Sequence, residues 1–251
     1  MPSTSPSTGS PARVVHAEEL DSLPPDDPRA RRSRVDLRRV HRAMRTLSIL
    51  ARGIARLGLP VPPRRILELG AGDGTLLARL LRALRAKWDG GELILLDQHD
   101  LVSAATRAQF VDLGWRIQVL RADVAEWARS AHREHYDLCL TTLFLHHFQA
   151  PALTELLAAV AVSADAFIAC EPRRNAFSRL GSRLLFVLGV NDVTVDDGIK
   201  SVAAGFAARE LSALWPASSG EWRIEEYFAA PFTHCFAARR LSLTCPPSVI
   251  G

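Results

Sequence analysis

The feature that most constrains the fold is a repeated alternation of short apolar runs and amphipathic stretches, which starts at residue 64. The runs are RRILEL (64–69), ELILLD (92–97), WRIQVLRAD (115–123), YDLCLTT (136–142) and DAFIACEP (165–172). Each is short and mostly apolar, as strands buried on both faces are. The stretches between them carry leucines and alanines at helical spacing. This alternation predicts a parallel sheet covered by helices on both sides.

The C-terminal part departs from the alternation. The runs WRIEEYFAA (222–230) and FTHCFAARR (232–240) are separated only by Pro231, so we expect them to form an antiparallel pair. Before them, a helical insertion at 173–214 is predicted, with helical patterns at 175–189 and 201–215 and a loop at 190–198. The predicted fold class is α/β, with a doubly wound, mostly parallel seven-stranded sheet.

Differences in composition along the chain predict two terminal tails, a lead helix and a main domain. Residues 1–28 are rich in proline, serine, threonine and aspartate and show no apolar period, which predicts a disordered tail. Residues 29–59 predict one basic amphipathic lead helix, ended by Gly58 and Pro60. The main domain is then expected at 60–240 and a second tail at 241–251.

Positive charge is concentrated in the lead helix. Ten arginines and one acid, Asp36, lie between Arg29 and Arg56, a net charge of +9. Because the whole chain carries +4, the remainder carries −5, and a surface made for nucleic acid is not expected. Three interpretations of this helix stay open: a helix packed on the sheet with its arginines in solvent, a lid over a binding site, or attachment to an anionic membrane.

The chain has no apolar run long enough to cross a bilayer, and its first fifteen residues lack the apolar core of a secretion signal. A cytoplasmic location is therefore expected. The four cysteines, Cys139, Cys170, Cys235 and Cys245, include no CxxC pair. Three of them lie in predicted strands, so we expect buried free thiols rather than disulfides or zinc ligands.

The turn ELGAGDG (68–74) follows the first predicted strand. Gly70, Gly72 and Gly74 permit unusual φ values and a close approach of backbone to a ligand. Ligands of doubly wound sheets bind at this edge, where the next helix also directs its amides. The third glycine of the dinucleotide motif G-x-G-x-x-G would fall at residue 75, which is threonine, so a dinucleotide site is disfavoured.

The turn, with Asp97 at the end of LILLD and Asp123 in RADV, resembles class I S-adenosylmethionine-dependent methyltransferases. The resemblance covers roughly residues 60–240. It implies S-adenosylmethionine as cofactor, with Glu68 near the ammonium of its methionine end, Asp97 on the ribose hydroxyls, and Asp123 with the amide of Val124 at the adenine. The implied cofactor-binding set is Glu68, Gly70, Ala71, Gly72, Gly74, Asp97, Gln98, Asp123, Val124 and Thr141. An aspartate after a strand also commonly caps a helix, and this alternative stays open for Asp123.

The segment TTLFLHHF (141–148) lies where that family places catalytic residues. It lacks the Asn/Asp-Pro-Pro-aromatic motif of amino-group methylation, and neither Cys139 nor Cys170 has the setting of a cytosine-methylating nucleophile. The pair His146 and His147 resembles the LHH of small-molecule methyltransferases of the ubiquinone-biosynthesis type. This implies an oxygen acceptor and a histidine base, preferably His146, although either ring could instead cap the next helix. Neither histidine pairs with an acid at a metal-ligand spacing, so no metal site is predicted.

Three further segments, DDPRARRSRVDLRRVHRAM, ACEPRR and VNDVTVDDGIKSVAAGFAARELSALW, resemble bacterial methyltransferases found with type III polyketide synthases. This implies a phenolic or quinone-like acceptor, with or without a lipid tail, from secondary metabolism. The VTVDDG sequence stands where an Arg-His-Asp sequence is usual, so no substrate residue is carried over there. Glu171, Arg173 and Asn175 are candidates for substrate contact. RNA methylation and a non-catalytic cofactor-binding scaffold remain the alternatives.

Overall fold

The computed structural model describes residues 12–130, 134–216 and 220–241. Its core is a seven-stranded sheet in the order β3-β2-β1-β4-β5-β7-β6. The strands are β1 (Arg65–Leu69), β2 (Gly91–Asp97), β3 (Trp115–Arg121), β4 (Leu138–Thr142), β5 (Ala166–Pro172), β6 (Trp222–Ala229) and β7 (Thr233–Arg240). The first five are parallel, whereas β7 runs antiparallel to β5 and β6. The predicted mostly parallel sheet and its antiparallel C-terminal pair are confirmed.

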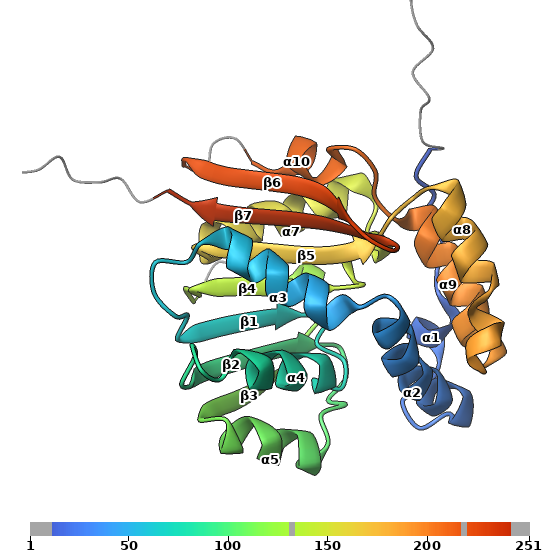
Figure 1. Cartoon of the computed structure of the whole chain (residues 1–251), viewed down its shortest axis with the longest axis horizontal. Helices are drawn as coiled ribbons and strands as arrows, with labels where there is room; N and C mark the ends of the chain where they lie inside the picture. Colours follow the sequence, from blue (N-terminus) through green and yellow to red (C-terminus); the bar gives the residue numbers. More distant parts are fainter. Residues whose placement is uncertain (1–11, 131–133, 217–219, 242–251) are drawn as a thin grey trace, which may run out of the picture.

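Helices cover both faces of the sheet (Figure 1). One face packs on α3 (Thr46–Leu57), α4 (Thr75–Leu84) and α5 (Ala104–Asp112), and the other on α6 (Val124–Arg129), α7 (Ala150–Ser163) and α10 (Glu210–Leu214). Each face buries its own apolar cluster, which explains why the strands read as continuous apolar runs. The chain order reverses between β1 and β4, and this is where a doubly wound sheet opens a crevice.

The predicted single lead helix is two helices, α2 (Pro28–Ala43) and α3. Arg45 breaks it with a left-handed backbone, φ 58°. Helix α3 lies on the sheet, whereas α2 leaves the sheet and packs against α9 (Asp192–Ala204), beyond the carboxyl ends of the parallel strands (Figure 1). The apolar period runs through the break without a glycine or proline to mark it, so the sequence pattern could not reveal it.

The insertion also differs from its prediction. The helix expected over 175–189 is α8 (Ala176–Arg183) followed by the 3₁₀ segment η2 (Leu185–Leu188). The prediction of a loop at 190–198 is wrong, because α9 begins at Asp192. Asn191 caps this helix by accepting a hydrogen bond from the Thr194 amide at 3.0 Å. The helix expected over 201–215 is interrupted at Gly205. A Cβ there would lie 2.3 Å from the Pro172 carbonyl oxygen.

Residues 12–22 form a strap across the insertion, with the short helix α1 (Glu19–Ser22) at its end. The Val14 amide donates to Ala203 O at 3.2 Å, and Arg13 Nε donates to Ala204 O at 2.7 Å. The prediction of a disordered tail over residues 1–28 is therefore wrong from residue 12 onward. The predicted tail at residues 1–11 and most of that at 241–251 lie outside the described residues.

The cysteines that the structure describes lie in strands of the sheet. Cys139, Cys170 and Cys235 are buried free thiols, as predicted, and the last two have their sulfur atoms 3.8 Å apart across β5 and β7. Cys245 lies outside the described residues.

Within the described residues, no helix combines the length and apolarity that crossing a membrane requires.

Candidate active site

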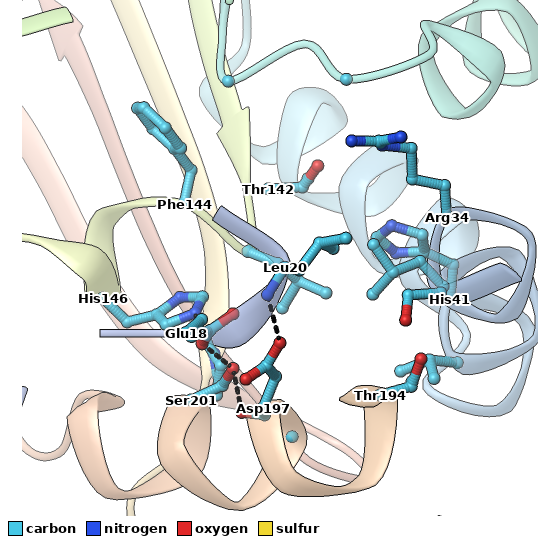
Figure 2. Close-up of a pocket in the computed structure, with 18 of the residues that line it drawn as sticks. Glu18, Leu20, Arg34, His41, Thr142, Phe144, His146, Thr194, Asp197 and Ser201 are labelled. Atoms are coloured by element: carbon cyan, nitrogen blue, oxygen red, sulfur yellow. Dashed lines mark hydrogen bonds and ion pairs between the residues drawn. The ribbon is translucent and has the colours of Figure 1, made fainter. Parts of the chain in front are cut away.

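A cavity of about 740 Å³ opens at the carboxyl ends of β1, β2 and β4. Its floor is the glycine turn and the strand ends, and its other walls come from the strap, α2, α8, η2 and α9. Figure 2 shows side chains from the strap, α2 and α9 pointing toward those of the strand ends. Segments far apart in sequence therefore enclose one chamber.

The glycine turn forms the floor of the cavity. The amides of Gly70 and Ala71 both donate to Leu96 O, at 2.9 and 3.1 Å, which draws the turn toward the end of β2. Gly70 has φ 65°, and a Cβ on it would lie 2.3 Å from the Phe144 ring, so only glycine fits. Gly72 also has a left-handed backbone and lines the cavity, whereas Gly74 starts α4 and lies against Phe110 rather than in the cavity wall.

Glu68 is a buried acid in this wall. Its side chain lines the cavity and is only 4% exposed, yet its Oε2 atom has no hydrogen-bond partner among the described residues. Burial, and then the nearby charges of Asp73 and Asp97, raise the pKa of this carboxyl well above its usual range. A buried acid without a partner is costly, so the geometry fits a cationic group that enters from the cavity.

Asp97 and Asp123 take the two further positions expected at the strand ends. Asp97 Oδ2 accepts from the Gly72 amide at 2.9 Å and its Oδ1 accepts from the His99 amide at 3.0 Å. Asp123 caps α6 by accepting from the Ala125 amide at 2.6 Å, the alternative that the sequence left open. Both aspartates line the cavity, together with Gln98 and Val124. Asp123 therefore caps α6 and also belongs to the cavity wall.

Thr141, like Gly74, is a predicted cofactor residue that lies outside the cavity wall. Its side chain is fully buried, and its hydroxyl donates to Leu69 O at 2.9 Å between β4 and β1. The next residue, Thr142, lines the cavity instead. Side chains alternate along a strand, so a shift of one residue moves the threonine from the core to the site.

His146 lies in a buried row of charged groups. Its Nδ1 is 2.8 Å from Glu171 Oε2, and its Nε2 is 3.3 Å from Glu18 Oε1 of the strap. The other oxygen of Glu171 accepts from the amides of Phe144 and Leu145, at 3.0 and 2.9 Å. Burial alone would lower the pKa of His146, but the hydrogen bonds and charges of the two glutamates outweigh it and raise the pKa to about 9. The ring is therefore protonated near neutral pH.

His147 has a different environment. Its Nδ1 lies 3.0 Å from Asp21 Oδ2, while its Nε2 is 4.0 Å from Glu18 Oε2, beyond hydrogen-bond distance. The ring is one-fifth exposed, whereas that of His146 is buried, and both residues line the cavity. The aspartate fixes the orientation of this imidazole.

The strap is held over the cavity by carboxylates. Glu18 accepts from the Ser201 hydroxyl, and Asp197 accepts from the amides of Glu19 and Leu20, at 2.8 and 3.0 Å (Figure 2). The sequence did not indicate Glu18 as a site residue, because 128 positions separate it from His146. Its being an acid does not distinguish it either, because Glu19, Asp21, Asp26 and Asp27 lie in the same segment.

Glu18, His146 and His147 bring potential metal-ligand atoms within 4.8 Å of one another. Both ring nitrogens of His146, however, already have a carboxylate partner at hydrogen-bond or ion-pair distance. An ion-paired network accounts for this arrangement, and the absence of a metal site stays a prediction.

The three residues proposed for substrate contact after the fifth strand have other roles. Glu171 lies within β5, where it is fully buried and holds His146. The Arg173 guanidinium stacks over the Phe228 ring, 3.9 Å from its centroid. Asn175 caps α8 by accepting from the Ser178 amide at 2.7 Å. None of the three is part of the cavity wall among the described residues.

Comparisons with known proteins agree with this arrangement. Residues 66–163 match the family model of a methyltransferase domain. No curated protein matches the sequence.

Several solved structures share the fold. The plantazolicin methyltransferase BpumL, in complex with a monoazolic desmethylPZN analog and SAH, has 18% identity and a TM-score of 0.58, over 86% of this chain and 91% of that chain. A putative O-methyltransferase from Nostoc punctiforme PCC 73102 has 14% identity and a TM-score of 0.53, over 78% of this chain and 56% of that chain. The magnesium protoporphyrin IX methyltransferase of Synechocystis PCC 6803, with bound SAH, has 13% identity and a TM-score of 0.50, over 79% and 84%.

The chain thus spans only about half of the Nostoc protein, and at these identities the likeness concerns the fold. The resemblance to class I methyltransferases is confirmed at that level by the sheet order and by the domain match. Residues 66–163 match a methyltransferase domain and the chain shares the fold of solved methyltransferases, a likeness that implies S-adenosylmethionine as the cofactor.

Proposed function

We propose that the protein transfers a methyl group from S-adenosylmethionine to an oxygen of a small phenolic or quinone-like acceptor. The observation that carries the proposal is the juxtaposition of two features in one cavity. Glu68, a buried carboxyl without a partner, lies beside the glycine turn, and the oriented imidazole of His147 lines the same chamber. The first suits the cofactor and the second suits an acceptor hydroxyl.

The residues fit the cofactor by their chemistry. Glu68 would hold the ammonium of the methionine end, which supplies the positive charge that this carboxyl lacks. Asp97 would hold the ribose diol, because each carboxylate oxygen can accept more than the one backbone hydrogen bond it has. Asp123 and Val124 would border the adenine. When bound, the cofactor supplies a methyl group on a positively charged sulfur.

Cofactor binding is expected to release a proton from Glu68. The raised pKa favours the protonated form of this carboxyl in the free protein, and an ammonium beside it favours the ionised form. Calorimetry at pH 7 in buffers of different ionisation enthalpy measures this directly. We expect net proton release for S-adenosylmethionine and for S-adenosylhomocysteine, since both carry the ammonium. In Glu68→Gln the release should disappear, and an unchanged proton count in that variant would place the ammonium elsewhere.

We infer that His147, rather than His146, is the base. His146 is protonated near neutral pH and buried between two glutamates, so it has no free acceptor nitrogen. His147 lines the cavity, Asp21 holds its Nδ1, and its Nε2 has no carboxylate closer than Glu18 at 4.0 Å. His147 Nε2 would take the proton of the acceptor hydroxyl, while the cofactor would give up its methyl group to the oxygen and leave as S-adenosylhomocysteine. His146 and Glu171 position the segment that carries this ring.

The His147→Gln variant is expected to lower kcat by about 10²-fold or more, the usual contribution of a positioned base. The loss should shrink at alkaline pH, where a phenol ionises without help. The control is His135→Gln, because His135 is an exposed histidine paired with Asp165 outside the cavity. A pH-independent loss in His147→Gln would assign the ring to packing instead of proton transfer.

The acceptor chamber is mainly apolar. Phe144, Phe148, Leu184, Leu185, Val187 and Leu188 line it. Such a wall suits an aromatic ring, and the strap and α2 above it suit a small acceptor better than a polynucleotide. In the VTVDDG segment, Asp197 holds the strap, so this departure from the polyketide-associated pattern has a structural role here.

The acceptor class is tested by incubating the protein with S-adenosylmethionine carrying a labelled methyl group and a panel of alkylphenols, quinols, aromatic amines and RNA. Label in a phenol or quinol ether supports the proposal. Transfer to RNA or to amines alone would contradict it. Cofactor binding without turnover of any acceptor would favour the scaffold alternative.

A further inference from the structure

The outer surface of α8 and η2 is unusually apolar. Six large apolar side chains there are each between 39% and 69% exposed: Phe177, Leu180, Leu184, Phe186, Val187 and Leu188. They form one stretch of twelve residues, which we call the apolar ridge. Soluble proteins rarely expose so many neighbouring large apolar groups without a partner for them.

Arginines adjoin the apolar ridge. Arg32 and Arg39 of α2 each donate to Gly189 O at 3.2 Å, which places the basic helix against the end of η2. Further arginines are exposed on α2 and on α8 itself: Arg31, Arg42, Arg179 and Arg183. In Figure 1, α2 and α8 lie at the same end of the molecule, beyond the sheet. An apolar stretch with guanidinium groups around it complements a surface with anionic headgroups over hydrocarbon.

The apolar ridge is also the outer side of the acceptor chamber. Leu184, Val187 and Leu188 are exposed to solvent and line the cavity as well. A molecule that reaches the cavity past these side chains need not cross a polar surface. Within a bilayer, this wall would face the hydrocarbon region.

We propose that the apolar ridge inserts shallowly into an anionic phospholipid bilayer, with the arginines of α2 and α8 on the phosphates. The chamber then draws its acceptor from the membrane, so that the acceptor carries an apolar tail. Only this last step rests on the proposed function; the membrane contact itself does not. The charge around the ridge favours an anionic bilayer over a second copy of the chain as its occupant.

The test is sedimentation of the full chain with vesicles, in the absence of cofactor and acceptor. We expect binding to vesicles of equal parts phosphatidylcholine and phosphatidylglycerol, weaker at high salt, and much less binding to phosphatidylcholine alone. The variants Leu180→Asp and Phe186→Asp should each weaken binding at least about tenfold, because each replaces an apolar side chain that would be buried in the bilayer with a charged one. Neither residue lines the cavity.

The matched controls are Val111→Asp and Val162→Asp, exposed apolar positions on α5 and α7 away from the ridge. They should leave vesicle binding unchanged. A second variant avoids dependence on an added charge: Phe186→Trp should show fluorescence quenching by bromine-labelled lipid beyond that of the wild type. The proposal is overturned by an absence of binding at low salt, by equal loss in the controls, or by a change of oligomeric state in Leu180→Asp without an effect on vesicles. Because no turnover is measured, failure here is distinct from failure of the methyl transfer.

Discussion

Asp97→Ala is expected to weaken S-adenosylmethionine binding by about 10²-fold or more. A carboxylate that accepts two ribose hydroxyls makes charge-assisted hydrogen bonds, each worth about 1.5–3 kcal/mol. The same side chain holds the Gly72 amide at 2.9 Å, so its removal also frees the glycine turn. Titration calorimetry on the wild type and the variant measures the change in Kd.

The control for this experiment is Asp100→Ala. Asp100 follows three residues later and forms a surface ion pair with Arg107 at 2.6 Å, which contributes little to binding or stability. Its replacement should leave the affinity within about twofold of wild type, within the scatter expected for surface changes. Equal affinities for wild type and Asp97→Ala would remove Asp97 from the cofactor site.

Glu171→Ala is expected to lower the free energy of unfolding by about 3–5 kcal/mol, the usual cost of removing one partner of a buried charge pair. The variant leaves buried His146 with Glu18 as its remaining carboxylate partner, and it removes the hydrogen-bond acceptor of the Phe144 and Leu145 amides. Urea unfolding at pH 7 gives the value. Glu155→Ala on the exposed face of α7 is the matched control and should stay within about 0.5 kcal/mol of wild type.

The pH dependence gives this prediction a second readout. The pKa of His146 in the folded chain, about 9, lies above its ordinary value of 6.5. A raised histidine pKa stabilises the fold fully below about pH 6.5, and this contribution is lost as the pH rises through about 9. The difference between wild type and Glu171→Ala should therefore be smaller at pH 10 than at pH 7. A difference that does not change with pH would mean that Glu171 acts only through the two amides.

The sheet and the gathering of the strand-end residues around one cavity could be predicted, because both are encoded locally. Apolar strands buried on two faces are visible as continuous runs, and the glycine turn, Asp97 and Asp123 each follow a strand directly. These residues do lie together around the cavity. The parallel arrangement guarantees this, since the carboxyl ends of neighbouring strands meet at one edge.

The wall that the strap and the insertion form over the cavity could not be predicted in the same way, because long-range contacts build it. Glu18 reaches His146 from a segment without apolar period, and Asp197 reaches the strap from a stretch interpreted as a loop. Glu171 was noticed only because it was expected to follow the fifth strand, and its burial against His146 within β5 depends on tertiary packing. The break at Arg45, which sends α2 over the cavity, leaves no mark in the pattern.

The measurement that tests the central claim most directly is a crystal structure of the chain with S-adenosylhomocysteine. We predict that the amino group of the ligand lies against the Glu68 carboxylate and the ribose hydroxyls against Asp97, with the sulfur directed to the chamber that His147 lines. A ligand bound outside this cavity, or one with its adenine end at Glu68, would contradict the assignment of the site.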